Sequence, residues 1–259
     1  IIDQVVPCGH CYACRKGRPN VCGNLQVRGV HIDGGYREYM AVPDTDCYLV
    51  PDMLTDTEAV MIEPTTIAVQ CCSRAQLESE DTVLIIGSGA LGSSILRIVK
   101  QFQPRKIIVS DIDDAKLEEA LKNGATDVIN SLKEDVPARC HELTDGYGVT
   151  VSIDAACVKT SLITALNATG SAGRVITMGF SVAPTEVNQF AITSKELDVR
   201  GSRLQNRKFQ DVIDLINAGK IDLRGSISHT FPLTEAQKAF DFVDSHDPSI
   251  RKIAFTFDF

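Results

Sequence analysis

Four cysteines near the start of the chain have a spacing that metal sites use. They follow the pattern C-x2-C-x2-C-x7-C, and glycine and proline between them allow the loop to fold back tightly. Four thiolates fill the tetrahedral coordination sphere of zinc, so the pattern predicts a closed, structural zinc site. An iron–sulfur cluster and paired disulfides are the alternatives. His10 lies inside this segment, but four sulfurs already satisfy the metal, and we expect it in an exposed loop. The predicted ligands are Cys8, Cys11, Cys14 and Cys22.

A glycine-rich segment predicts a second chemistry, the binding of a dinucleotide. It matches G-x-G-x-x-G, follows an apolar β-branched run and opens a helical pattern, which is the context that this motif requires. Its glycines would permit a tight turn, let the backbone come close to the pyrophosphate and let the helix pack on the sheet. A glycine-rich turn without a nucleotide is the alternative. The residues are Gly87, Ser88, Gly89, Ala90, Leu91 and Gly92.

Asp111 ends the next predicted strand. A carboxylate at this position accepts hydrogen bonds from the ribose hydroxyls and repels a 2′-phosphate. The sequence therefore predicts NAD in preference to NADP.

Alternating strand and helix patterns surround these residues from about Thr82 to Arg203. This alternation is typical of βαβ units and predicts a doubly wound parallel sheet of the Rossmann type. The predicted strands are Thr82–Ile86, Lys106–Ser110, Val149–Ile153 and Val175–Met178. The predicted helices are Ala90–Phe102, Asp114–Asn123, which Gly124 would stop, and Leu162–Asn167, which Gly170 would stop.

The flanking segments have another character. The first part is turn-rich, with short β-like runs at Tyr36–Val42 and Cys47–Val50. The last part predicts a helix at Phe209–Asn217, a helix opened by a Thr234–Gln237 capping box, and a final strand at Lys252–Phe257. We place the transitions near residues 66 and 204, which gives the domains 1–66, 67–204 and 205–259.

Composition narrows the classes of partner. The chain has 259 residues and a net charge of −8, which argues against nucleic acid and anionic membranes, because both attract basic patches. No apolar stretch is long enough to span a bilayer, and no signal peptide is visible. Nine cysteines, an odd number, indicate metal ligands and free thiols rather than a disulfide framework. We expect a cytoplasmic protein.

The order of the motifs resembles one family. The cysteine lobe, the segment Gly34-Gly35-Tyr36-Arg37-Glu38-Tyr39, then Ile62-Glu63-Pro64 and the fingerprint are similar to zinc-containing medium-chain dehydrogenases/reductases, in the sorbitol, L-idonate and L-galactonate dehydrogenase branch. The likeness continues through Lys195-Glu196-Leu197 and His229-Thr230-Phe231-Pro232. It implies an α/β fold: a Rossmann coenzyme domain plus the remainder of a GroES-like, β-rich catalytic domain, to which residues 205–259 return.

The resemblance also implies residue roles. Glu63 would ligate a catalytic zinc or hold its water; a buried carboxylate with a local partner is the alternative. Lys116 would approach the adenosine ribose beside Asp111. Arg203 would lie at the nicotinamide, although a surface salt bridge is the alternative, and His31 is expected to be a loop residue. The residues implied at the nicotinamide are Met178, Gly179, Phe180, Ser202 and Arg203.

One departure from the family limits the expected activity. The family carries a catalytic cysteine and a His-Glu pair upstream of the cysteine lobe, and this sequence starts after that region. The one His-Glu dipeptide, His141-Glu142, lies in a predicted helix of the coenzyme domain. We therefore expect residues 1–259 alone to bind NAD without transferring hydride, and a metal site that Glu63 cannot complete by itself.

The leading hypothesis is a zinc-dependent oxidoreductase that transfers hydride between NAD and a secondary alcohol on a polyol or sugar acid. Its expected partners are this small molecule and further copies of the chain in a homodimer or homotetramer, since the family pairs coenzyme domains through their sheet edges. A zinc-free, NADPH-dependent reductase of the quinone type is one alternative. A non-catalytic NAD-binding sensor or scaffold, which kept the fold and lost the chemistry, is the other.

Overall fold

The computed structural model describes residues 1–245, 247 and 249–257 and divides into two compact units. Unit 1 contains Ile1–Ile67 together with the described residues from Leu204 onward, and unit 2 contains Ala68–Arg203. Among the described residues, no helix has the length and apolar character needed to cross a membrane.

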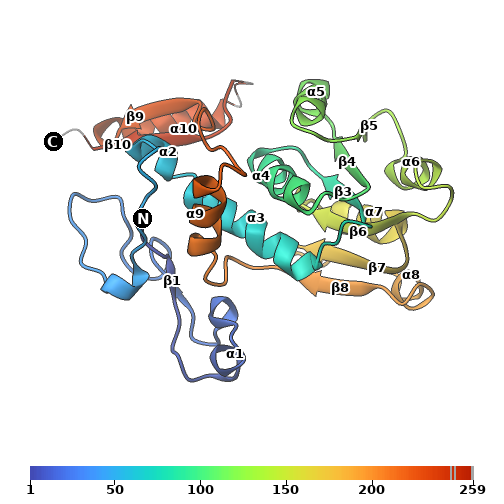
Figure 1. Cartoon of the computed structure of the whole chain (residues 1–259), viewed down its shortest axis with the longest axis horizontal. Helices are drawn as coiled ribbons and strands as arrows, with labels where there is room; N and C mark the ends of the chain where they lie inside the picture. The colour runs from blue at the N-terminus through green and yellow to red at the C-terminus, as the bar shows by residue number, and fades with distance from the viewer. Residues whose placement is uncertain (246, 248, 258–259) are drawn as a thin grey trace. The chain divides into compact units, whose positions relative to one another are not determined.

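Unit 2 is built on a six-stranded sheet with the order β5-β4-β3-β6-β7-β8 (Figure 1). Every neighbouring pair in it is parallel. The predicted Rossmann-type α/β fold is confirmed. The strands are β3 (Thr82–Ile86), β4 (Lys106–Asp111), β5 (Asp127–Asn130), β6 (Val149–Asp154), β7 (Thr169–Thr177) and β8 (Asp198–Gly201).

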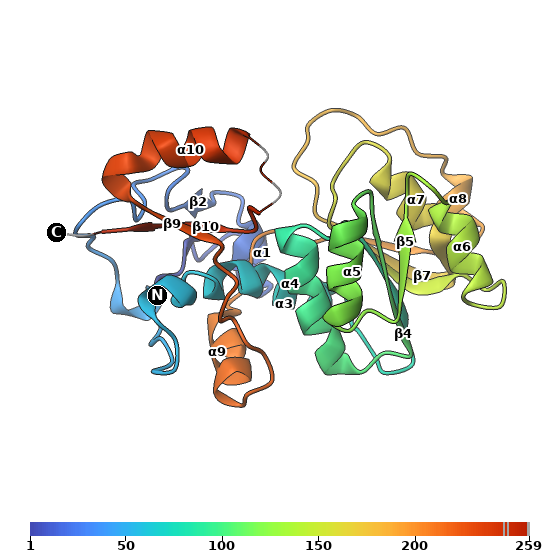
Figure 2. The same cartoon turned by 90° about the horizontal axis from the view of Figure 1, so that it is seen from above.

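The helices of unit 2 connect successive strands and cover both faces of the sheet. Figure 2 shows α4 and α5 on one side of the strands and α6 and α7 on the other. Asp113 and Asp135 open α5 and α6, because their carboxylates accept the N–H groups of Ala115 and Ala138. The helices are α3 (Ile62–Ala75, which begins in unit 1), α4 (Ala90–Val99), α5 (Asp114–Lys122), α6 (Val136–Glu142), α7 (Ser161–Ala168) and α8 (Phe190–Thr193).

Branched apolar side chains seal both faces of the sheet, because the consecutive residues Val83, Leu84 and Ile85 of β3 are all fully buried. Leu84 of β3, Ile108 of β4 and Ile129 of β5 are fully buried and join one apolar cluster with Val175 of β7. A strand that is buried on both faces has to be apolar at consecutive positions, which is the pattern of parallel sheets. The polar residues at the ends of the strands are left available to bind a ligand.

A buried ion pair closes the amino-terminal edge of the sheet. Arg174 of β7 donates to the carboxylate of Asp81, and the two side chains are only 16% and 5% exposed. The same guanidinium donates to the carbonyl of Ala75 at the end of α3 at 2.9 Å, and Thr150 of β6 donates to Asp81 at 2.7 Å. Three elements are therefore fixed through one charged group.

Unit 1 has two small sheets. β1 (Val5–Val6) pairs with β2 (Gln26–Val27) in the antiparallel sense, and β9 (His229–Pro232) pairs with β10 (Ile253–Thr256) in the parallel sense. The α-helices are α1 (Tyr12–Arg15), α2 (Asp56–Ala59), α9 (Phe209–Asn217) and α10 (Ala236–Asp244). The 3₁₀ turns, in both units, are η1 (Pro19–Val21), η2 (Asp44–Asp46), η3 (Lys100–Phe102) and η4 (Leu233–Glu235).

Two strand predictions for unit 1 are wrong. Residues 36–42 form no strand, and in the second run only Cys47 makes an isolated bridge, with Ile2. Tyr36 and Tyr39 are 72% and 87% exposed, so the apolar positions that suggested a half-buried strand do not share a buried face in the described chain. Alternation alone does not make a strand without a partner to accept its hydrogen bonds.

The predicted helix boundaries also need corrections. Thr234 lies in η4 and caps nothing, while Gln237 donates to Asp241 one turn further along. The capping box belongs instead to Thr55 and Glu58, which open α2. Gly170 is not a helix stop: it lies inside β7, where a Cβ would come within 2.2 Å of the Tyr147 carbonyl oxygen. The segment predicted as Ala90–Phe102 is α4 followed by η3.

We expect Arg174→Met to destabilise unit 2 by about 3 kcal/mol or more, because it leaves the Asp81 carboxylate buried and unpaired. Urea unfolding followed by circular dichroism measures this change. Arg105→Met is the matched control: Arg105 pairs with Glu80 at 3.9 Å on the surface, so its loss should cost less than about 1 kcal/mol. Equal effects for the two variants would show that the buried pair is not a stabilising contact.

Candidate coenzyme and metal sites

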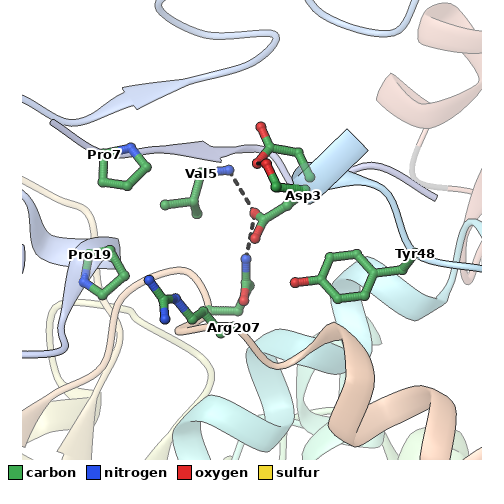
Figure 3. A pocket seen from close by; sticks show the side chains of 9 residues that line it. Asp3, Val5, Pro7, Pro19, Tyr48 and Arg207 are labelled. Atoms are coloured by element: carbon green, nitrogen blue, oxygen red, sulfur yellow. Dashed lines mark hydrogen bonds between the residues drawn. The ribbon is translucent and has the colours of Figure 1, made fainter. Parts of the chain in front are cut away.

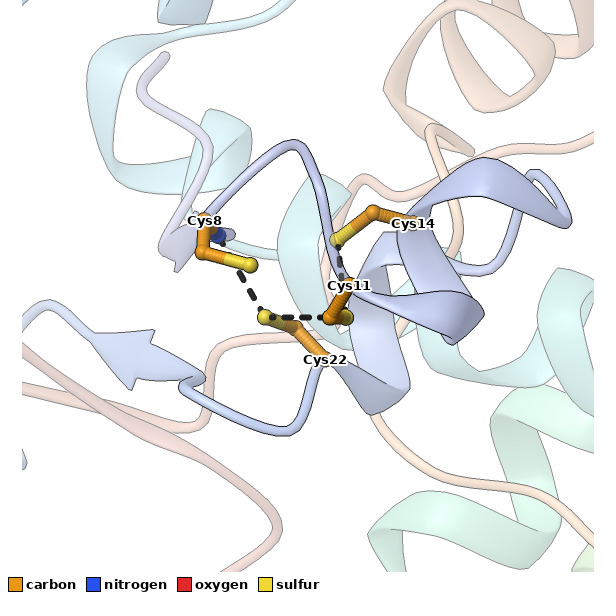
Figure 4. Close-up of side chains that lie close together, drawn as sticks. All are labelled: Cys8, Cys11, Cys14 and Cys22. Atoms are coloured by element: carbon orange, nitrogen blue, oxygen red, sulfur yellow. Dashed lines mark hydrogen bonds between the residues drawn. The ribbon is translucent and has the colours of Figure 1, made fainter.

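The structure brings the four predicted zinc ligands together (Figure 4). Cys8 follows β1, Cys11 and Cys14 lie at the start of α1 and within it, and Cys22 ends η1. Their sulfur atoms all lie within 4.8 Å of one another, with Cys11 3.5 Å from Cys14 and 3.7 Å from Cys22. A zinc–sulfur bond of about 2.3 Å places tetrahedral sulfurs about 3.8 Å apart. The residues present therefore fit a zinc ion with four thiolate ligands.

Backbone N–H groups surround these sulfurs and favour thiolates. The amides of Cys8 and Asn24 both donate to the Cys22 sulfur at 3.3 Å. Those of Cys14 and Gly23 lower the pKa of the Cys11 thiol to about 6. Desolvation and the neighbouring thiols raise the pKa of Cys14 to about 12. A negative charge on one sulfur thus disfavours a negative charge on the next. A divalent cation bound between them would offset this repulsion.

Two histidines near the cysteine lobe have local roles. The ring of His10 is hydrogen-bonded to the carbonyl of Cys8 at 2.7 Å and is exposed. The ring of His31 accepts the N–H of Val27 at 3.1 Å in the turn after β2. Both lie in loops, as expected from the sequence.

The glycine-rich turn joins β3 to α4. Gly87 has φ +96°, and a Cβ there would lie 2.9 Å from the Ala156 nitrogen. A Cβ on Gly92 would lie 1.9 Å from the Gly87 carbonyl oxygen, so neither position tolerates a side chain. A Cβ on Gly89, by contrast, meets nothing within 4 Å. Open space beside a helix N-terminus, which Ala90 and Leu91 begin, is what a pyrophosphate needs.

The carboxylate of Asp111 lies directly beside this turn. Its Oδ2 accepts the N–H of Ser88 at 2.6 Å, and its Oδ1 accepts the N–H of Asp113 at 3.0 Å. The Ser88 hydroxyl donates to the carbonyl of Lys116 at 3.4 Å, and the Lys116 side chain is exposed on α5. The structure thus brings Ser88 of the glycine-rich turn beside Asp111 and Lys116, the two residues expected at the adenosine ribose.

The residues expected at the nicotinamide follow the ends of β7 and β8. Met178 is buried, Phe180 is 71% exposed, and the Arg203 guanidinium lies 5.9 Å from the centre of the Phe180 ring. The Ser202 amide donates to Thr177 at 2.9 Å and ties the two strand ends together. The Ser202 hydroxyl is buried and has no hydrogen-bond partner among the described residues. A buried hydroxyl without a partner is suited to a ligand or a water molecule.

One segment at this edge of the sheet, the turn after β6, was not predicted from the sequence. Asp154 ends β6 and accepts the N–H of Cys157 at 2.9 Å and the hydroxyl of Ser161 at 2.8 Å. This holds Ala156 against Gly87, while a Cβ on Gly179 would lie 3.8 Å from Cys157. A carboxylate that ends a buried strand, as Asp111 also does, is the signal that could have identified it.

Glu63 lies in the first turn of α3 and accepts a hydrogen bond from Gln4. Burial raises the pKa of Glu63, and the positive charge of Lys252 opposes that shift. The other amide atom of Gln4, Oε1, is buried without a partner in the described chain. Across the residues that the structure describes, the four-cysteine set alone groups three or more metal-binding side chains. The described residues therefore do not complete a catalytic zinc site around Glu63.

Comparisons with known proteins define the family. The zinc-binding dehydrogenase family matches residues 90–218, and the alcohol dehydrogenase GroES-like domain matches residues 1–52. The starvation-sensing protein RspB of Escherichia coli (strain K12) is 39% identical over 99% of this chain and 75% of that protein. Sorbitol dehydrogenase of Bacillus subtilis (strain 168) is 28% identical over 93% of this chain and 70% of that protein.

Solved structures agree with this family. A short chain alcohol dehydrogenase (rspB) from E. coli CFT073, complexed with NADH, superposes with a TM-score of 0.92 at 39% identity and covers 99% of this chain and 76% of its own. A putative zinc-binding dehydrogenase from Sinorhizobium meliloti 1021, bound to NADP, superposes with a TM-score of 0.85 at 27% identity and covers 92% of this chain and 71% of its own. The chain belongs to the zinc-containing medium-chain dehydrogenase family, as its motifs predicted, and this membership supports a redox activity on a small molecule.

We expect Cys11→Ser to lose the zinc of the cysteine lobe, because removing one of four ligands opens the coordination sphere. Metal analysis of the purified protein should show about one zinc per chain before the substitution and little after it. Cys47→Ser, at an exposed cysteine outside the cluster, is the control and should keep its zinc. Full zinc content in the Cys11 variant would contradict the assignment.

Proposed function

We propose that the protein is a zinc-dependent oxidoreductase that transfers hydride between NAD and a secondary alcohol on a polyol or sugar acid. The observation that carries the coenzyme part is the Asp111 carboxylate, hydrogen-bonded to the Ser88 amide beside the open space at Gly89. Sorbitol dehydrogenase, a polyol dehydrogenase by name, is among the relatives and favours this substrate class.

The coenzyme choice follows from charge. The relatives include one structure with NADH and one with NADP, so membership in the family leaves the choice open. A carboxylate at the ribose accepts hydrogen bonds from its hydroxyl groups, and it would repel the 2′-phosphate of NADP in this partly exposed site. Lys116 is exposed on α5 and, by the family resemblance, would approach the same ribose beside Asp111.

The chain's own residues would bind and orient the reactants. The turn amides from Gly89 to Leu91 would hold the pyrophosphate. Met178 would form the apolar wall behind the nicotinamide, and Ser202 would offer its hydroxyl to the amide of that ring. Glu63 would contribute one ligand to a catalytic zinc, or hold its water. The bound NAD supplies the hydride acceptor, and a zinc ion would supply a Lewis acid for the hydroxyl oxygen.

Two alternatives remain distinguishable. A non-catalytic sensor or scaffold would bind NAD and turn over no alcohol. This alternative is kept because one relative is named a starvation-sensing protein. A zinc-free quinone-type reductase would use NADPH. The four-cysteine cluster and Asp111 both argue against this alternative.

β8 is an end strand of the sheet. We propose that a homodimer or homotetramer forms through its outer edge.

Asp111→Ser should narrow the preference for NADH over NADPH by about tenfold or more, because it removes the carboxylate that opposes the 2′-phosphate. Fluorescence titration with each coenzyme gives the two dissociation constants. Glu118→Ser, which removes an exposed carboxylate from α5, is the control and should leave the ratio unchanged. A parent protein that binds NADPH as tightly as NADH would overturn the NAD proposal.

Where further ligands complete a metal site around Glu63, Glu63→Gln should lower polyol-dependent formation of NADH by about tenfold or more while leaving the dissociation constant of NADH unchanged. The amide keeps the size of the side chain and removes the anionic oxygen that a metal or its water requires. Glu38→Gln, at an exposed position of the same unit, serves as the control. Unchanged turnover in the Glu63 variant would remove this residue from the mechanism, and NADH binding without turnover once that metal site is complete would favour the sensor.

A further inference from the structure

Unit 1 contains a pocket of about 380 Å³ that has no assigned role. One side of it is apolar, formed by Val5 and two prolines, and the other is polar (Figure 3). The polar groups come from segments far apart in the sequence: Asp3, Asp46, Tyr48, Gln205 and Arg207. A concave site with an apolar wall and a few convergent polar groups is the usual form of a small-molecule site.

Asp3 is held rigidly, with one oxygen left over. Its side chain is buried, and its Oδ1 accepts the N–H of Val5 at 2.8 Å and the amide of Gln205 at 2.7 Å. Gln205 is fixed in turn, because its own oxygen accepts the N–H of Lys208 at 2.8 Å. Asp3 Oδ2 accepts no hydrogen bond from the described residues, so this oxygen remains available as an acceptor.

Arg207 supplies the opposite charge. It forms no salt bridge with any acidic group in the described chain, whereas Arg28 neutralises Asp46 at 2.7 Å. Its backbone is left-handed, with φ +53°, and Asn206 anchors the loop by donating to the Gly17 carbonyl at 2.8 Å. A non-glycine residue in this conformation costs free energy, which the surrounding structure must offset, and such positions concentrate at ligand sites.

Tyr48 provides a third free group. Its ring stacks on Phe209, with ring centres 5.0 Å apart and planes at 19°. The stacking fixes the direction of the hydroxyl, which points toward the space between Asp3 and Arg207 (Figure 3). This hydroxyl makes no hydrogen bond with the described residues. The pocket therefore presents one free acceptor, one free cation and one group that can both donate and accept.

The pocket is separate from Glu63. Asp3 and Gln4 are consecutive, and side chains of consecutive residues in an extended segment point to opposite faces. Asp3 faces Gln205 and the pocket, whereas Gln4 donates to Glu63. A ligand in the pocket therefore does not need the groups proposed for hydride transfer.

We propose that this pocket is a second binding site, for a small carboxylic acid that carries hydrogen-bond donors at its other end. The carboxylate pairs with the Arg207 guanidinium and accepts the Tyr48 hydroxyl, and the donors bind Asp3 Oδ2. Arg207 selects an anion, since its planar donors match a carboxylate. Asp3 selects against a plain fatty or dicarboxylic acid, whose second end would bring an apolar group or a like charge to it. Hydroxy acids and amino acids share the required chemistry, with hydroxyl or ammonium as the donor.

Calorimetric titration of the full chain with gluconate and, separately, with β-alanine, which has an ammonium group and no hydroxyl, tests this site. We expect one of the two to bind at millimolar concentration or tighter, which also tells whether the donor is hydroxyl or ammonium. Arg207→Gln should weaken that binding by about tenfold or more, because it removes a charge-assisted contact. Tyr48→Phe keeps the stack on Phe209, removes only the hydroxyl, and should weaken binding several-fold. Arg37→Gln, at a surface salt bridge with Asp33, should leave binding unchanged.

Two outcomes would overturn the proposal. One is no binding of either acid by the parent protein. The other is binding that Tyr48→Phe and Arg207→Gln leave unchanged; if Arg207→Gln does not fold, Tyr48→Phe decides alone. Glu63→Gln separates this site from the proposed reaction: gluconate bound at the pocket should keep its affinity in that variant, whereas gluconate bound as a substrate should lose it.

Discussion

The coenzyme edge of unit 2 depends on a contact between two stretches of backbone with no side chain between them. A Cβ on Gly92 would lie 1.9 Å from the Gly87 carbonyl oxygen, so α4 can start this close to the end of β3 only with glycine at that position. The close start brings the Ser88 amide to the Asp111 carboxylate and leaves room for Ala156 against Gly87. Displacing the helix would separate the Ser88 amide from the Asp111 carboxylate, which we propose binds the ribose.

The features that the sequence predicted well are those determined by neighbours along the chain. The glycine turn, the Asp111 strand end and the start of the helix at Asp114 lie close together in sequence, and each has a residue type with a specific backbone role. The four cysteines span a short loop, so their spacing alone limits how they can meet. Because the strands of a parallel sheet need apolar residues on both faces, continuous runs of apolar residues also predicted β3 and β4.

The features that the sequence missed depend on long-range contacts. Asp3 accepts a hydrogen bond from Gln205, which lies 202 positions away in the chain. Neither segment contains a local sequence pattern that predicts the pocket. The runs at Tyr36–Val42 and Cys47–Val50 show the converse. Their alternation of apolar and polar residues predicted strands, but a strand also needs a neighbouring strand to accept its hydrogen bonds, and the alternation does not provide one. α3 went unpredicted because its buried positions include the polar residues Thr65, Thr66 and Gln70, which hide the helical spacing of its apolar residues. The role of Glu63 rests on ligands outside its own segment and stays a prediction.

The order of the units along the chain has a consequence for synthesis. Unit 2 is one continuous segment, Ala68–Arg203, whereas unit 1 needs both the first residues and those after Leu204. On a ribosome, the coenzyme sheet can fold before unit 1 receives α9, β9 and β10. The cysteine lobe is made before unit 2 and before those elements, and its contact with Asn206 can form only after unit 2 has been made. Early capture of a metal ion by the lobe would protect the nascent chain from wrong disulfides during that interval.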